Sequence, residues 1–221
     1  AALTDVMAPG HHGNISAGVQ AGDTVAVVGD GAVGLCAVRA AKRIGAGRII
    51  ALGHHADRLE VAKRFGATDI VTSRGDEAAA AVKEMTGGGA IRVLECVGTD
   101  ESFNTAIHAC RAGGRVGHVG VPIGGHLDMA DCHMRNVGIV GGVAPARRYI
   151  PELLADVLAG TLDPSPVFDM TVDLAHVPAG SAALGERRAV PAEPHCPFVQ
   201  VRYRLLDHGH SRQRQLSQPR M

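Results

Sequence analysis

Three closely spaced glycines mark the part of this chain best suited to hold a phosphate-containing ligand. An apolar run, Thr24–Val28, leads directly into a Gly-x-Gly-x-x-Gly turn. In such a turn the first glycine permits a tight bend, the second lets the backbone approach a pyrophosphate, and the third allows the next helix to pack closely. The pattern predicts a dinucleotide site, and the alternative is a glycine turn without a ligand. The predicted binding residues of the turn are Gly29, Asp30, Gly31, Ala32, Val33 and Gly34.

The sequence after the turn alternates between helical and strand-like segments. The predicted helices are Ala32–Ile44, Asp57–Phe65, Asp76–Met85, Glu101–Arg111 and Ile150–Ala159. The predicted strands are Thr24–Val28, Arg48–Leu52, Asp69–Val71, Ile91–Cys96, Arg115–Val119 and Val137–Val140, with a further one at Phe168–Leu174. Continuously apolar strands indicate a parallel sheet that is covered on both faces. We therefore predict an α/β fold with a doubly wound, six-stranded sheet in the order 3-2-1-4-5-6, the Rossmann arrangement.

The residues after the second strand bear on the choice between NAD and NADP. An NAD site needs an acid at this tip, about 20 residues past the glycines, to accept from the ribose 2′-hydroxyl. Here the strand is followed by Gly53, His54 and His55, and Arg58 comes shortly after. These side chains offer donors for a 2′-phosphate, whereas Asp57 is expected in the first turn of the next helix. The sequence favours NADP, with NAD as the alternative.

Composition excludes several other classes of function. The 221 residues carry 22 basic and 22 acidic side chains, so no basic surface for nucleic acid is expected. The apolar runs are shorter than a membrane span. Five cysteines, an odd number without a CxxC pair, disfavour a disulfide framework and favour a cytoplasmic enzyme with reduced thiols.

Several segments together resemble the zinc-dependent medium-chain alcohol dehydrogenases. They are LTDVMAPGHH, VAVVGDGAVGLCAVRAAKRIGA, FGATDIV, VLECVGT, GGRVGHVGVP and RNVGIVGGVAPAR. The resemblance runs from about Leu3 to Val190 and implies a nicotinamide-linked oxidoreductase of alcohols and carbonyls, usually a homodimer or homotetramer. It also implies an oligomer contact along the edge strand Val137–Val140. In this family a catalytic domain that binds zinc precedes the Rossmann domain, and the resemblance leads us to expect that the present sequence starts at the join between them.

The resemblance extends the list of expected site residues. Asp5 occupies the position of a zinc ligand, a conditional one because the other ligands of the family are missing; zinc is therefore expected in the intact family but not in this chain. His11 and His12 are expected in the wall of the active site. The residues that follow the fourth and fifth strands are expected to line the cofactor cleft: Cys96, Val97, Gly98, Val119, Gly120 and Val121.

These inferences suggest a domain plan with remnants of a catalytic domain at both ends. Residues 1–22 are expected to form a linker helix, 23–145 the dinucleotide-binding domain, 146–190 a helix and remnant strands, and 191–221 a disordered tail. Pro191 stands where the family has a basic residue, which suggests a reading-frame change. The predicted function is the cofactor-binding portion of an alcohol dehydrogenase, inactive in isolation. The alternatives are a non-catalytic dinucleotide-binding or dimerisation module and a zinc-free quinone reductase relative.

Overall fold

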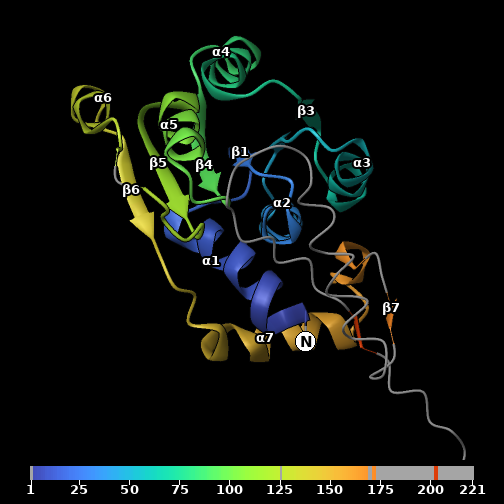
Figure 1. Ribbon diagram of the computed structural model, residues 1–221. Coiled ribbons are helices and arrows are strands. Elements are labelled where there is room, and N and C mark those ends of the chain that lie inside the picture. The colour runs from blue at the N-terminus through green and yellow to red at the C-terminus, as the bar shows by residue number, and fades with distance from the viewer. Residues whose placement is uncertain (1, 125, 169–170, 173–201, 204–221) are drawn as a thin grey trace, which may run out of the picture. The chain divides into compact units, whose positions relative to one another are not determined.

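Six parallel strands form the central sheet, in the order β3-β2-β1-β4-β5-β6 (Figure 1). This is the predicted fold class and the predicted strand order. The reversal of order between β1 and β4 places the glycine turn after β1 at the crevice where doubly wound sheets bind their ligands. The strands are β1 (Thr24–Val28), β2 (Arg48–Leu52), β3 (Asp69–Val71), β4 (Ala90–Glu95), β5 (Cys110–His118) and β6 (Gly138–Gly141).

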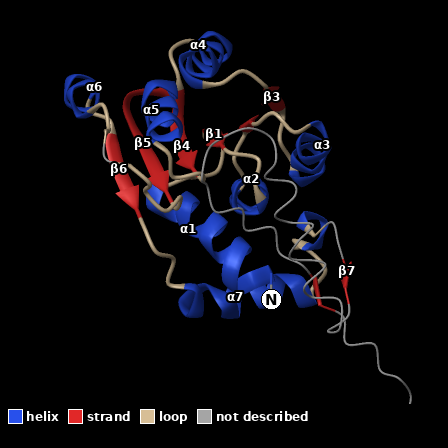
Figure 2. Ribbon diagram, in the orientation of Figure 1, coloured by secondary structure: helices blue, strands red, loops and turns tan. Residues whose placement is uncertain are grey.

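Helices cover both faces of this sheet (Figure 2). The first half of the chain supplies the helices η1 (Leu3–Met7), α1 (Ala8–Ala17), α2 (Ala32–Ile44), α3 (Ala56–Phe65) and α4 (Gly75–Thr86). The second half supplies α5 (Asp100–Ala109), α6 (Met129–Arg135), α7 (Ala146–Leu158) and the short 3-10 turn η2 (Ser165–Val167). The helices η1, α1, α2, α3 and α7 share one core cluster, and α4, α5 and α6 share the other.

The alternation of side chains along β1 explains the two cores. Val25 and Val27 face the α2 side, whereas Ala26 and Val28 face the α4 and α5 side. All four are at least 93% buried. A strand that is buried on both faces has no place for polar residues, and this accounts for the uninterrupted apolar run in the sequence.

Several elements differ in their limits from those expected. α5 ends at Ala109 and β5 already begins at Cys110, within a glycine-rich segment that has no apolar pattern. β6 lies one residue later than expected, and α7 begins at Ala146 rather than Ile150. The seven-residue helix α6 was not expected, because MADCHMR is too short and too polar to show a helical period.

The structure is a computed structural model that describes residues 2–124, 126–168, 171–172 and 202–203. Residues 2–168 fall in one compact unit. In a second unit, the two-residue strands β7 (Thr171–Val172) and β8 (Arg202–Tyr203) pair in parallel. The rest of the expected strand 168–174 and of the expected tail lies outside the described residues. None of the described helices combines the length and the apolar composition that a membrane span requires.

Candidate cofactor-binding site

The glycine turn between β1 and α2 has the geometry that its spacing predicts. Gly29 has a φ of 110°, a left-handed conformation that L side chains rarely adopt. Its N–H donates to the carbonyl oxygen of Leu52 at 3.0 Å, which ties the turn to β2. A Cβ on Gly34 would collide with the carbonyl oxygen of Gly29. The first and third glycines are therefore required by the fold itself.

The second glycine of the turn is different, because the space around it is open. A Cβ on Gly31 would meet nothing within 4 Å. Gly31 is the N-cap of α2, and neither a side-chain cap nor an acid in the first turn occupies the free N–H groups of this helix. Ala32 and Val33 form the first turn and are only half-buried. This open helix N-terminus can accept a pyrophosphate.

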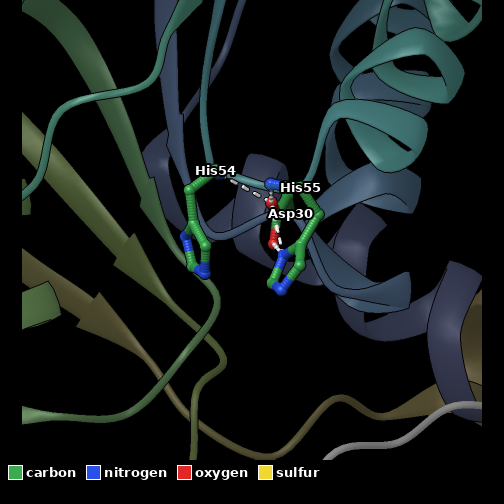
Figure 3. Close-up of side chains that lie close together, drawn as sticks. All are labelled: Asp30, His54 and His55. Atoms are coloured by element: carbon green, nitrogen blue, oxygen red, sulfur yellow. Dashed lines mark hydrogen bonds and ion pairs between the residues drawn. The ribbon is translucent and has the colours of Figure 1, made fainter. Parts of the chain in front are cut away.

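Asp30 connects the glycine turn to the two histidines after β2 (Figure 3). Its Oδ2 accepts the backbone N–H of His54 at 2.8 Å and that of His55 at 2.9 Å. The Nδ1 of His55 lies 3.0 Å from the same oxygen. A Cβ on Gly53 would lie 2.6 Å from this oxygen, so the strand end is packed directly against the carboxylate.

The carboxylate of Asp30 is ionised and largely enclosed. Burial alone would raise its pKa, but the hydrogen bonds from the backbone of His55 and His54 and from the His55 ring outweigh burial and lower the pKa below 3.8. A carboxylate can only accept, so His55 carries its proton on Nδ1. The guanidinium of Arg58 lies 3.7 Å from Oδ1. No acid directly follows β2 in sequence, but Asp30 reaches the strand tip from the glycine turn, a contact that spacing along the sequence does not indicate.

The tip of β3 brings an unpredicted residue to the same edge. β2 and β3 are paired, with Leu52 opposite Val71, and Arg74 follows β3 as the N-cap of α4. Its guanidinium lies 2.6 Å from Nε2 of His54. The signal for Arg74 was present in the sequence, since it follows the strand that this sheet order places beside β2.

The segment after β4 is organised by a buried acid. Oε1 of Glu95 accepts the N–H of Val97 and of Gly98, both at 2.7 Å, and the hydroxyl of Ser102 at 2.8 Å. Burial raises the pKa of Glu95 despite these bonds. Burial likewise raises the pKa of Cys96 well above its usual value, so its thiol stays protonated and is a poor nucleophile.

The segment after β5 lies against the segment after β4. Val119 donates its N–H to the carbonyl oxygen of Glu95 at 2.9 Å, and Gly120 donates to the same oxygen at 3.3 Å. A Cβ on Gly98 would collide with the carbonyl oxygen of Val121. The side chain of Val121 is 69% exposed and that of Val97 is 37% exposed. The two predicted cleft-lining segments thus come together at the carboxyl edge of the sheet.

The predicted zinc ligand is not part of a metal-binding group in the described structure. Asp5 is exposed in η1, and among the described residues no cluster of three potential metal ligands includes it. His11 is buried and lies 2.8 Å from the carboxylate of Glu152 on α7. His12 lies 2.9 Å from the hydroxyl of Tyr149 on the same helix. The two histidines therefore join α1 to α7.

The sequence and the fold both have close counterparts among known proteins. A family described as zinc-binding dehydrogenase matches residues 32–159, more than half of the chain. A probable zinc-binding alcohol dehydrogenase of Mycobacterium tuberculosis is 36% identical over 84% of this chain and 48% of its own length. An NADP-dependent isopropanol dehydrogenase of Clostridium beijerinckii is 35% identical over 71% of this chain and 46% of its own length. The chain spans about half the length of these curated relatives.

Solved structures agree with the sequence comparison. The alcohol dehydrogenase TADH of Thermus sp. ATN1 has a TM-score of 0.77 at 29% identity, covering 85% of this chain and 55% of that one. The benzyl alcohol dehydrogenase of Acinetobacter calcoaceticus has a TM-score of 0.72 at 29% identity and covers 83% of this chain and 52% of that one.

Proposed function

Since the chain belongs to the family of zinc-binding dehydrogenases, the medium-chain alcohol dehydrogenases, we propose that it supplies the NADP(H)-binding part of an alcohol or carbonyl oxidoreductase. The observation that carries this proposal is the open glycine turn beside a strand tip rich in donors. The open space beside Gly31, which has no Cβ, and the uncapped N-terminus of α2 fit a pyrophosphate. When bound, the nicotinamide carries the hydride that an alcohol gives up or a carbonyl receives.

The chain's own residues have distinct tasks in this proposal. The first turn of α2 holds the pyrophosphate through backbone N–H groups. The exposed apolar side chains of Val97 and Val121 border the position of the nicotinamide, because both follow strands at the carboxyl edge of the sheet. The backbone of residues 119–121 supplies polar contacts to the nicotinamide's carboxamide.

The tip of β2, with His54 and His55, favours NADP over NAD. The oxygens of Asp30, which would otherwise suit the ribose hydroxyls, already accept from His54 and His55, and the side chain is only 8% exposed. This leaves the ring of His54 and the guanidinium of Arg58 to meet a 2′-phosphate. The isopropanol dehydrogenases of Clostridium beijerinckii and Thermoanaerobacter brockii are NADP-dependent, which supports the same preference.

Unlike a dinucleotide, a catalytic zinc ion does not fit the described residues. A catalytic zinc site takes three protein ligands and keeps one open position, and Asp5 is joined by no such set among residues 2–124 and 126–168. A second candidate function is a dinucleotide-binding or dimerisation module without catalysis of its own.

Two further assignments are part of the proposal. β6 is at one end of the sheet order, and Val140 is 45% exposed there, which supports a homo-oligomer contact along this edge. The cytoplasmic location rests on the odd number of cysteines and stays a prediction.

Binding of the reduced cofactors to the 221-residue chain tests the proposal directly. Titration with NADPH and NADH, followed by nucleotide fluorescence or calorimetry, is expected to give tighter binding of NADPH. Equal or tighter binding of NADH would refute the cofactor preference. Failure to bind either nucleotide would refute the function.

A further inference from the structure

The carboxyl ends of β2 and β3 form a joint surface. The two strands run in parallel, and the N–H of Gly53 donates to the carbonyl oxygen of Val71 at 3.0 Å. The chain leaves β3 at this point and reaches Arg74 three residues later. His54 and Arg74 are therefore neighbours in space although twenty residues separate them in sequence.

The contact between these two side chains fixes the state of the histidine. A guanidinium only donates, so Nε2 of His54, 2.6 Å away, must accept and the ring must be neutral. Partial burial and the neighbouring His55 lower the pKa of His54, and Arg74 and Arg58 lower it further, against the opposing effect of Asp30. The histidine thus stays neutral near pH 7 and orients the arginine.

The charges around His54 favour an anion over a metal ion. Asp30, His54 and His55 have ligand atoms within 4.8 Å of one another, a spacing that suits a cation. However, Nε2 of His54 is occupied by the Arg74 guanidinium and Nδ1 of His55 by the Asp30 carboxylate. A cation would also sit beside two guanidinium groups, those of Arg58 and Arg74. Asp30 is buried, whereas Arg74 is exposed, so the positive charge of Arg74 faces solvent.

We propose that Arg74 is a specificity-determining residue, whose guanidinium binds the 2′-phosphate of NADP(H) while His54 holds it in place. This inference rests on the proposed function. A guanidinium presents several N–H donors in a plane, and a phosphate accepts two of them at once. His54 uses one donor of Arg74, so the others are available to the phosphate. The phosphate subsite is then built from two strand tips, β2 and β3.

Substitution of Arg74 with measurement of both cofactors tests this inference. Arg74→Gln is expected to weaken NADPH binding by about 10- to 100-fold, the size of a charge-assisted contact. NADH binding should change by less than about 2-fold, because this cofactor lacks the phosphate. Arg74→Lys keeps the charge without the planar fork and should restore part of the NADPH affinity.

The matched control is Arg64→Gln, which removes the same charge from an exposed position in the last turn of α3. It should leave the affinities for both cofactors within about 2-fold of the native chain. An unchanged ratio of NADPH to NADH affinity in Arg74→Gln would overturn the role of Arg74, as would an equal loss of both cofactors. In either case NADPH binding by the native chain would still support the proposed function. A native chain that binds neither cofactor would overturn both.

Discussion

The carboxylate of Asp30 and the backbone nitrogen of His54 are joined by a hydrogen bond of 2.8 Å across 24 residues of sequence. This bond connects the turn that would hold the pyrophosphate to the turn that would hold the adenosine ribose. Because the same carboxylate also accepts from His55, one side chain sets the position of the whole strand tip. In the proposed site, Asp30 is therefore expected to position the strand tip rather than to bind the ribose.

Asp30→Ala is expected to lower both stability and NADPH affinity. The N–H groups of His54 and His55 would lose their acceptor, at a cost of about 1–3 kcal/mol in the free energy of unfolding. Urea denaturation measures the first effect and NADPH titration the second. Glu60→Ala is the control, since the Glu60 side chain is 67% exposed on α3 and makes a surface ion pair with Lys63. A variant at Asp30 as stable as the control would contradict this account.

Gly31→Asp is expected to abolish binding of both cofactors while the chain stays folded. The new side chain would enter open space, so the fold has no reason to change. Its carboxylate would stand where the pyrophosphate approaches the N-terminus of α2 and would repel it. Gly31→Ala provides a graded control with weaker but measurable binding. Undiminished NADPH affinity in Gly31→Asp would place the pyrophosphate elsewhere.

Stability is expected to fall as the pH drops through about 6.5, and His11 should account for part of the loss. Burial lowers the pKa of His11 below 6.5, although Glu152 acts in the opposite direction. The unfolded chain therefore binds more protons than the folded one in this window, and stability rises with pH there, by at most about 1.4 kcal/mol per pH unit for one group. Urea denaturation of native and His11→Asn chains between pH 5 and pH 8 measures the slope.

The His11→Asn chain should show a shallower slope than the native chain. His126→Asn serves as the control because His126 is exposed. A slope that is identical in the native and His11→Asn chains would assign the pH dependence to other groups.

The 221-residue chain is expected to bind no stoichiometric zinc and to oxidise no alcohol. Three protein ligands are needed for a catalytic zinc, and Asp5 has no such companions among the described residues. Metal analysis after gel filtration, combined with assays of primary and secondary alcohols in both directions, provides the test. If zinc is retained, Asp5→Ala tests the predicted ligand, and Asp30→Ala and Asp128→Ala test the two described groups of three potential ligands, Asp30 with His54 and His55, and His108 with Asp128 and Asp131. Zinc-dependent turnover would show that other residues complete the site.

The strand order and fold class could be predicted from the sequence because the pattern of apolar runs that determines them is local. An apolar run such as Thr24–Val28 can be buried on both faces only in a covered parallel sheet, and six such runs with helices between them restrict the topology strongly. The pattern failed where the chain is glycine-rich or polar, at the start of β5 and at α6. There the fold is set by neighbouring elements rather than by local periodicity.

The site was predicted less completely, for a related reason. The glycine turn is a contiguous motif, so its members could be identified from spacing alone. The contact of Asp30 with the end of β2 and that of Arg74 with His54 depend on strand pairing and on rotamers. The predicted strand order places the residues after β3 beside the tip of β2, but spacing along the sequence does not report the contacts themselves, which form only after β1, β2 and β3 come together.

The shared surface at the ends of β2 and β3 has a consequence for protein engineering. Transplanting only residues 53–58 into a relative that uses NAD would transfer the histidines without Asp30, which orients their backbone, and without Arg74, which contacts His54. Such a chimera would have the same residues 53–58, but this loop would be free to adopt another conformation. A transferable change of cofactor would have to move three separate segments of the chain together.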